Sequence, residues 1–139
     1  MDSENVLEKV NAMCKNTLME TLGIRFTEIG NEQVSATMPV NSKVHQPLGL
    51  LHGGASIALA ESVGSMASLL FIDSSKFEAR GIEISANHVK SKKEGWVTGI
   101  ARNIHKGKTT HLWEIRIVDE AGDLISICKL TNIILPKKI

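Results

Sequence analysis

A long, mostly apolar segment runs from Gly54 to Phe71 and carries a single acidic side chain, Glu61. On a 3.6-residue helical wheel, the bulky apolar side chains fall on one side: Leu59, Val63, Met66 and Leu70. The opposite side carries Glu61 among small residues: Gly54, Ala58, Ser65 and Ser68. The pattern predicts a helix whose bulky face packs on a sheet, while its small-residue face admits a close neighbour and displays a carboxylate.

Most of the remaining chain alternates between apolar and polar positions, which is typical of strands. Alternating runs cover residues 24–29, 33–38, 82–89, 96–104, 110–118 and 124–135. The first two flank Gly30 and predict a hairpin or one bulged strand ended by Pro39, and the last four predict strands in hairpin succession. An amphipathic helix is expected from about Glu4 to Leu22, ended by Gly23, and a loop over residues 41–49.

These elements predict a single α+β domain over residues 1–139, with a curved antiparallel sheet of about five to six strands wrapped around the helix at 54–71. Such a sheet leaves open edges, and the second face of the helix needs a partner. Both are covered if two copies associate side by side. A homodimer is therefore expected from packing alone.

Composition narrows the classes of function. The chain of 139 residues has a formal net charge of +1, which gives no sequence-wide case for nucleic acid or a membrane surface. A central acid argues against a membrane span over 54–72. No secretory layout precedes the two distant cysteines, Cys14 and Cys128, so reduced thiols in a cytoplasmic protein are expected. The histidines lack metal-ligand spacing, and no metal is expected.

The start of the long helix is the candidate site for chemistry. Gly53 and Gly54 allow a ligand to approach the backbone closely, and a helix start offers unpaired N–H groups to developing negative charge. Glu61 is a candidate base or nucleophile because it stands alone among small residues. Simpler interpretations are that Glu61 is an ordinary solvated residue and that the glycine pair is only a turn.

A longer motif carries a family resemblance. Residues 45–54 read His-Gln-Pro-Leu-Gly-Leu-Leu-His-Gly-Gly, followed by Ala55, and Glu61-Ser62-x-Gly64-Ser65 comes one helical stretch later. This pattern, with residues 86–91 and 130–131, resembles the hotdog-fold acyl-CoA thioesterases. It is similar to the branch of the phenylacetate-pathway, Arthrobacter-type 4-hydroxybenzoyl-CoA and 1,4-dihydroxy-2-naphthoyl-CoA enzymes.

The resemblance implies a role for each matching residue. Glu61 corresponds to the catalytic carboxylate, as nucleophile on the thioester carbonyl or as base for the attacking water. Gly53 would give its backbone N–H to the carbonyl oxygen. Gln46 and His52 correspond to residues that orient or polarise the thioester, and Ser65 to a hydroxyl that steadies water or the carboxylate. His52 has a simpler alternative as a cap of the loop.

The resemblance also implies where coenzyme A binds. Pantetheine and phosphate contacts would come from Asn87, His88, Lys90, Lys106, Gly107 and Lys108. The lysines have the alternative of ordinary surface solvation. Coenzyme A is part of the substrate, so no separate cofactor is expected. Relatives are commonly homotetramers of two dimers, with an active site shared between subunits.

The function expected is hydrolysis of a CoA thioester to a free acid and CoA. Small residues beside Glu61 leave room for a planar acyl group, and the resemblance favours an aromatic one, with 1,4-dihydroxy-2-naphthoyl-CoA of menaquinone synthesis as candidate. A carrier-protein thioester is a further substrate class. Two alternatives from other classes are a non-catalytic binder of CoA esters and a hotdog hydratase or dehydratase.

Overall fold

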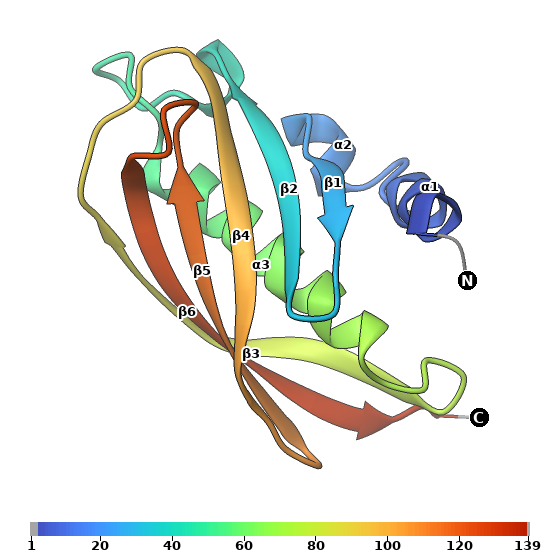
Figure 1. Ribbon diagram of the computed structural model, residues 1–139. Helices are drawn as coiled ribbons and strands as arrows, with labels where there is room; N and C mark the ends of the chain where they lie inside the picture. The colour runs from blue at the N-terminus through green and yellow to red at the C-terminus, as the bar shows by residue number, and fades with distance from the viewer. Residues whose placement is uncertain (1–2, 139) are drawn as a thin grey trace.

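The computed structural model describes residues 3–138, and it has one long helix enclosed by a curved sheet (Figure 1). The elements in chain order are α1 (Ser3–Met13), α2 (Leu18–Leu22), β1 (Arg25–Ile29), β2 (Gln33–Val40), a short 3-10 helix η1 (Ser42–Val44), α3 (Gly53–Leu70), β3 (Phe77–His88), β4 (Gly95–Lys106), β5 (Thr110–Val118) and β6 (Leu124–Pro136).

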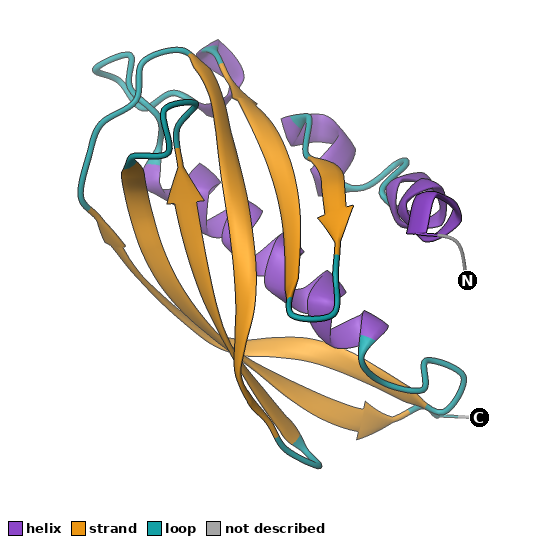
Figure 2. Ribbon diagram, in the orientation of Figure 1, coloured by secondary structure: helices purple, strands orange, loops and turns teal. Residues whose placement is uncertain are grey.

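The six strands form one antiparallel sheet in the order β1-β2-β4-β5-β6-β3. Figure 2 shows the sheet curving around α3, with α1 and α2 beside the β1 edge. The predicted fold class, a curved antiparallel sheet around one long helix, is confirmed.

The prediction that the last four strands follow one another as hairpins is wrong for β3. This strand pairs with β6 and forms one edge of the sheet, whereas β4 lies between β2 and β5. Alternation identifies a half-buried strand but carries no information about its neighbours. The connection over residues 89–94 therefore crosses from the sheet edge to its centre.

The N-terminal region contains two helices where one was predicted. Asn16 takes a left-handed backbone angle (φ 62°), and the Thr17 hydroxyl accepts a hydrogen bond from the Met19 N–H at 3.2 Å, so a new helix begins there. Gly23 ends this second helix, as predicted, with φ 74°. Pro39 does not end β2, because it lies beyond Thr37, the last β2 residue paired with β1.

The predicted bulky face of α3 packs against the sheet. Leu59 and Val63 have no exposed surface, Met66 is buried and Leu70 is half-buried. The prediction was wrong for Ser68, which was assigned to the small-residue face but is 0% exposed. Because the sheet curves around the helix, residues of β5 and β6 contact Ser68 as well.

Gly64 sets the spacing between α3 and the sheet. A Cβ on this residue would lie 2.5 Å from Leu130 Cδ2 and 3.3 Å from Ile115 Cδ1. Real side-chain contacts at the first of these distances are repulsive, so a residue without a side chain is required here. The helix therefore approaches β5 and β6 more closely than any larger residue would allow.

Both cysteines are free and buried. Burial raises the pKa of the Cys14 thiol above its ordinary value and raises the pKa of Cys128 to about 11. Both side chains are therefore neutral thiols at physiological pH, which suits packing in the core and does not suit a nucleophile. Within residues 3–138, no helix combines the length and the apolar character that crossing a membrane requires.

Gly23→Ala is expected to lower the free energy of unfolding by more than Gly122→Ala, measured by urea denaturation. Both glycines have positive φ, 74° and 86°, so alanine strains each backbone by about 1 kcal/mol. Only at Gly23 would the new Cβ also meet a side chain, Pro39 Cγ at 2.9 Å, which adds roughly 1–3 kcal/mol. Equal losses in the two variants would show that the contact with Pro39 carries no cost.

Candidate functional site

Glu61 lies in the middle of α3, on the face that the sheet leaves uncovered. Its side chain is half-buried and lines a hollow of about 510 Å³, together with Leu18, Met19, Gly54, Ile57, Ala58, Ser62, Ser65, Met66, Leu69 and Ala79. The carboxylate has no hydrogen-bond or ion-pair partner among residues 3–138. This half-buried position, beside mostly apolar and small side chains, differs from that of a fully exposed, solvated residue.

The start of α3 presents a free backbone donor. His52 is the N-cap, and its Nδ1 accepts a hydrogen bond from the Gly54 N–H at 2.8 Å. The Gly53 N–H has no acceptor among the described residues. The positive end of the helix macrodipole therefore offers the amide of Gly53 to a negatively charged oxygen.

His52 thus has a capping role, as in the simpler of the two interpretations of this residue. Because Nδ1 accepts from an amide, the hydrogen-bond pattern assigns the proton of the neutral ring to Nε2. The imidazole holds the first turn of the helix in place and keeps one N–H to donate elsewhere.

A second hollow, of about 330 Å³, lies over the helix start. Four residues expected at the site, Gln46, Gly53, His88 and Lys90, share it with Leu50, Leu51, Ser56, Val89, Ser91, Ile125 and Ser126. The His88 ring lies over Gly53, since a Cβ there would be 2.7 Å from His88 Nε2. The ring is held from behind by a 2.7 Å hydrogen bond between its Nδ1 and Ser126 Oγ. Gln46 Oε1 accepts from the Leu48 N–H within its own loop.

One chain does not bring Glu61 and Gly53 to the same point. Glu61 follows Gly53 by eight residues of one helix, which is about 12 Å along the helix axis. The structure therefore places Glu61 and Ser65 in one hollow, and Gln46, Gly53, His88 and Lys90 in another.

The basic residues expected to bind coenzyme A occupy two regions. Lys90 Nζ lies 3.1 Å from Asp119 Oδ2 and 2.9 Å from Asp123 Oδ2, and hydrogen bonds to Asp123 and then Asp119 raise the pKa of Lys90. Its charge is thus already balanced. Asn87 is exposed on β3 near the same end.

The hairpin between β4 and β5 lies at the other end of α3. Lys106, Gly107 and Lys108 line a hollow of about 410 Å³ with Phe71, Ile72, Asp73, Phe77, His111 and Ile134. Lys106 Nζ is 4.9 Å from the centre of the Phe71 ring, a cation–π distance. Lys108 has no ion-pair partner among residues 3–138.

Sequence reasoning missed a buried polar network beneath Glu61. Ser68 Oγ lies 2.8 Å from each of three polar groups, on His111, Trp113 and Asn132. Asn132 occupies an inward position of β6 between the buried Leu130 and Ile134. A polar residue at a core position of an alternating strand was the signal that could have identified it.

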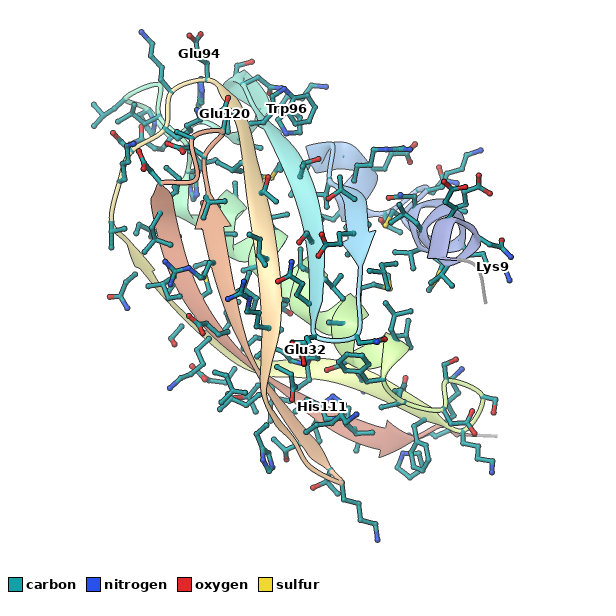
Figure 3. All side chains as sticks on the ribbon, viewed as in Figure 1. Lys9, Glu32, Glu94, Trp96, His111 and Glu120 are labelled. Carbon is teal, nitrogen blue, oxygen red and sulfur yellow. The ribbon has the colours of Figure 1, made fainter. Side chains whose placement is uncertain are left out.

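His111 lies near the start of β5, at the lower end of the sheet in Figure 3. Burial lowers the pKa of His111 below its ordinary value, and the positive charge of Lys106 and the neighbouring His105 lower it further. The ring is therefore neutral at physiological pH. Within residues 3–138, no three His, Cys, Asp or Glu side chains are grouped so as to hold a metal ion.

Comparison with known proteins gives the family. The model of the thioesterase superfamily matches residues 48–126, more than half of the chain. The chain belongs to the thioesterase superfamily. It is a thioester hydrolase with the hotdog fold of that family.

Individual thioesterases resemble this chain over nearly its whole length. It is 46% identical to the 1,4-dihydroxy-2-naphthoyl-CoA hydrolase of Escherichia coli, over 93% of this chain and 94% of that protein. It is 43% identical to the proofreading thioesterase EntH of Cronobacter turicensis, over 93% of each. The crystal structure of a mutant of thioesterase PA1618 from Pseudomonas aeruginosa superposes with a TM-score of 0.93, at 48% identity and 94% coverage of both chains.

The free energy of unfolding of this thioesterase is expected to fall as the pH drops from about 7.5 to 5, and more steeply than in His111→Asn. The folded state holds the pKa of His111 below its unfolded value of 6.5, so the unfolded chain binds more protons between the two values. The contribution of His111 to the free energy of unfolding is complete at a pH above its pKa in the unfolded chain. It is lost as the pH falls through its lower pKa in the folded protein. Asparagine can accept from Ser68 without titrating, and parallel curves for the two proteins would contradict the assignment.

Proposed function

We propose that this thioesterase hydrolyses an aromatic CoA thioester, with the Glu61 carboxylate as nucleophile or general base. The observation that carries the proposal is the state of Glu61, which is half-buried in an apolar hollow and has no partner among the described residues. A carboxylate that already made an ion pair would be a poor base, and one in open solvent would be a poor nucleophile. Ser65 lies one turn later on the same face and can donate a hydrogen bond to the carboxylate or to a water.

The amide of Gly53 is proposed to stabilise the oxyanion. When the thioester carbonyl is attacked, its oxygen becomes negative, and a fixed N–H at a helix start stabilises this charge without reorganising. The free N–H of Gly53 supports this role. The amide of Gln46 in the same hollow, and the proton on Nε2 of His52, the residue before Gly53, are proposed as further donors that orient the thioester.

The complete site is proposed to form between two copies of the chain. About 12 Å of helix separates Gly53 from Glu61, so one carbonyl would use Glu61 of one copy and Gly53 of the other. Two features support a side-by-side pair: β3 is bonded on one side only, to β6, and Ile82 on this edge strand is 60% exposed. The small-residue face of α3 would then meet its counterpart. A tetramer of two such pairs stays a prediction.

Either role of Glu61 gives a balanced reaction. As a base, it takes a proton from water while the water oxygen bonds to the carbonyl carbon. The tetrahedral intermediate then collapses, the C–S bond breaks and CoA leaves as a thiolate that takes up a proton. As a nucleophile, Glu61 forms a mixed anhydride and expels the thiolate, and water then cleaves the anhydride.

The substrate class is argued from the hollow and the relatives. The small residues Gly54, Ala58 and Ser62 leave room beside Glu61 in this hollow, which suits a planar acyl group. One relative is named a 1,4-dihydroxy-2-naphthoyl-CoA hydrolase, and we propose this thioester as the candidate substrate. Lys108, which has no ion-pair partner among the residues that the structure describes, and the neighbouring Lys106 are proposed to contact coenzyme A phosphates, whereas the charge of Lys90 is already balanced.

Glu61→Gln is expected to lower kcat on aromatic CoA thioesters by at least about a hundredfold, because the amide has no lone pair basic enough to take a proton. Release of the thiol is measured with a thiol-reactive dye over a panel of aromatic and aliphatic acyl-CoAs. Glu94→Gln is the matched control, since Glu94 is exposed at the upper end of the molecule in Figure 3 and lines neither the hollow of Glu61 nor that of Gly53. Unchanged turnover in Glu61→Gln would overturn the role of Glu61, and turnover of aliphatic substrates alone would overturn the substrate class.

Gly53→Pro is expected to lower kcat by about 10²–10³ relative to Gly53→Ala, with similar thermal stability. Proline removes the N–H, and the first helical position accepts it because the preceding residue, His52, has an extended ψ of 131°. Alanine keeps the N–H and introduces the same Cβ against His88.

Co-expression of Gly53→Pro with Glu61→Gln is expected to restore about a quarter of the wild-type activity. In random pairing, half of the dimers are mixed, and each mixed dimer has one intact site of two. If Gly53 and Glu61 acted within one chain, no site would be intact in the mixture, and activity would stay at the level of the single variants.

A further inference from the structure

The side-chain amide of Asn132 has an orientation that its partners determine. Its Nδ2 donates to the Gly64 carbonyl at 3.2 Å and to Ser68 Oγ at 2.8 Å. If the amide were turned over, its oxygen would face the Gly64 carbonyl, and two acceptors would repel. Nδ2 therefore points to the helix, and Oδ1 points away from it.

Ser68 leaves no hydrogen for this oxygen. Trp113 Nε1 can only donate, so Ser68 Oγ accepts from it and from Asn132 Nδ2. Both lone pairs of Ser68 are then used, and its single O–H must donate to His111 Nδ1, 2.8 Å away. Each polar atom that contacts Ser68 Oγ is thereby paired, whereas Asn132 Oδ1 receives no hydrogen from this residue.

Asn132 Oδ1 is a buried acceptor without a partner among the described residues, on a side chain that is 0% exposed. Buried polar atoms in native proteins almost always have a partner, so this oxygen requires a donor. The place of that donor is indicated by Gly81 on β3. The three heavy atoms nearest to a Cβ built there are Glu61 Oε2 at 2.8 Å, Glu61 Cδ at 3.2 Å and Asn132 Oδ1 at 3.5 Å.

Two acceptors therefore face one small space that Gly81 keeps open. An ionised carboxylate has no hydrogen to give, and neither has an amide oxygen. A group with two hydrogens satisfies both, and a water molecule is the smallest such group. We propose that the space beside Gly81 binds one water molecule, which donates to Glu61 and to Asn132 Oδ1, and that Asn132 is a positioning residue for the hydrolytic step.

The inference rests on the proposed role of Glu61 and decides between its two versions. A water whose two hydrogens are donated to Glu61 and Asn132 has its lone pairs directed away from both, toward the hollow. Glu61 takes one proton as the water oxygen bonds to the carbonyl carbon, and the C–S bond then breaks to release the CoA thiolate. Glu61 therefore acts as a base, and the buried network prevents rotation of the amide that holds the water.

Asn132→Leu is expected to lower kcat by about tenfold to a hundredfold with little change in KM, because the attacking water loses one of its two anchors. Leucine keeps the branching at Cγ and leaves no donor unpaired, since Trp113 still donates to Ser68 and Ser68 to His111. Trp113→Phe is the control for damage to the network and the core. It removes a donor to the same Ser68 without touching Asn132 Oδ1, and its kcat is expected to stay within a few-fold of wild type.

Gly81→Ala is the second variant, and it places a methyl group where the water is proposed to lie. The backbone at Gly81 does not have a positive φ, so alanine adds no backbone strain, and the end of the flexible Glu61 side chain, 2.8 Å from the new Cβ, must shift slightly to admit the methyl group. Gly30→Ala in the β1–β2 turn is the matched control. A crystal structure of the wild type at high resolution is expected to show a water within hydrogen-bond distance of Glu61 and Asn132 Oδ1. The same position is expected to be filled by the methyl group in Gly81→Ala, with loss of activity.

The results separate the two proposals. If Glu61→Gln is inactive while Asn132→Leu keeps wild-type kcat and no water is seen beside Gly81, the water site is overturned and the role of Glu61 stands. If Glu61→Gln keeps full activity, the role of Glu61 is overturned, whatever the density shows. A loss in Trp113→Phe as large as that in Asn132→Leu would also overturn the specific role of Asn132.

Discussion

The contact between the bulky face of α3 and the inner face of the curved sheet is the interaction on which the other features of this thioesterase depend. Burial of Leu59 and Val63 fixes the rotation of the helix about its axis. That rotation leaves Glu61 on the uncovered side, and the helix start leaves the Gly53 amide free. The packing of one helix face thus fixes the positions of both groups to which the proposal gives a chemical role, about 12 Å apart along the helix axis.

Much of this arrangement could be predicted from the sequence because it depends on local periodicity. The 3.6-residue pattern located α3 to within a residue, and alternation indicated every strand, although β3 begins at Phe77, five residues before the predicted run at 82–89. What periodicity cannot give is which strands become neighbours, and the position of β3 beside β6 was missed for that reason. The break at Asn16 was missed because it depends on one backbone angle and one capping hydroxyl within an otherwise helical pattern.

The candidate site was predictable in its parts and less so in its geometry. The motif from Gln46 to Ser65 identified the loop and the carboxylate, and the structure places these residues in two hollows. Asn132 and His111 escaped notice because the significance of a buried polar residue lies in its partners. Those partners come from α3, β5 and β6, and only the folded chain brings them together.

The absent side chain at Gly64 has a wider consequence. It lets the helix axis approach β6 closely enough for the Asn132 amide to reach a main-chain carbonyl of α3. The distance between helix and sheet therefore affects both the packing of the interior and the position of Glu61, the proposed catalytic group. Substitutions that enlarge this distance would lower the stability of the fold and also displace Glu61. Adaptation to a new temperature could therefore hardly change the stability without changing the activity.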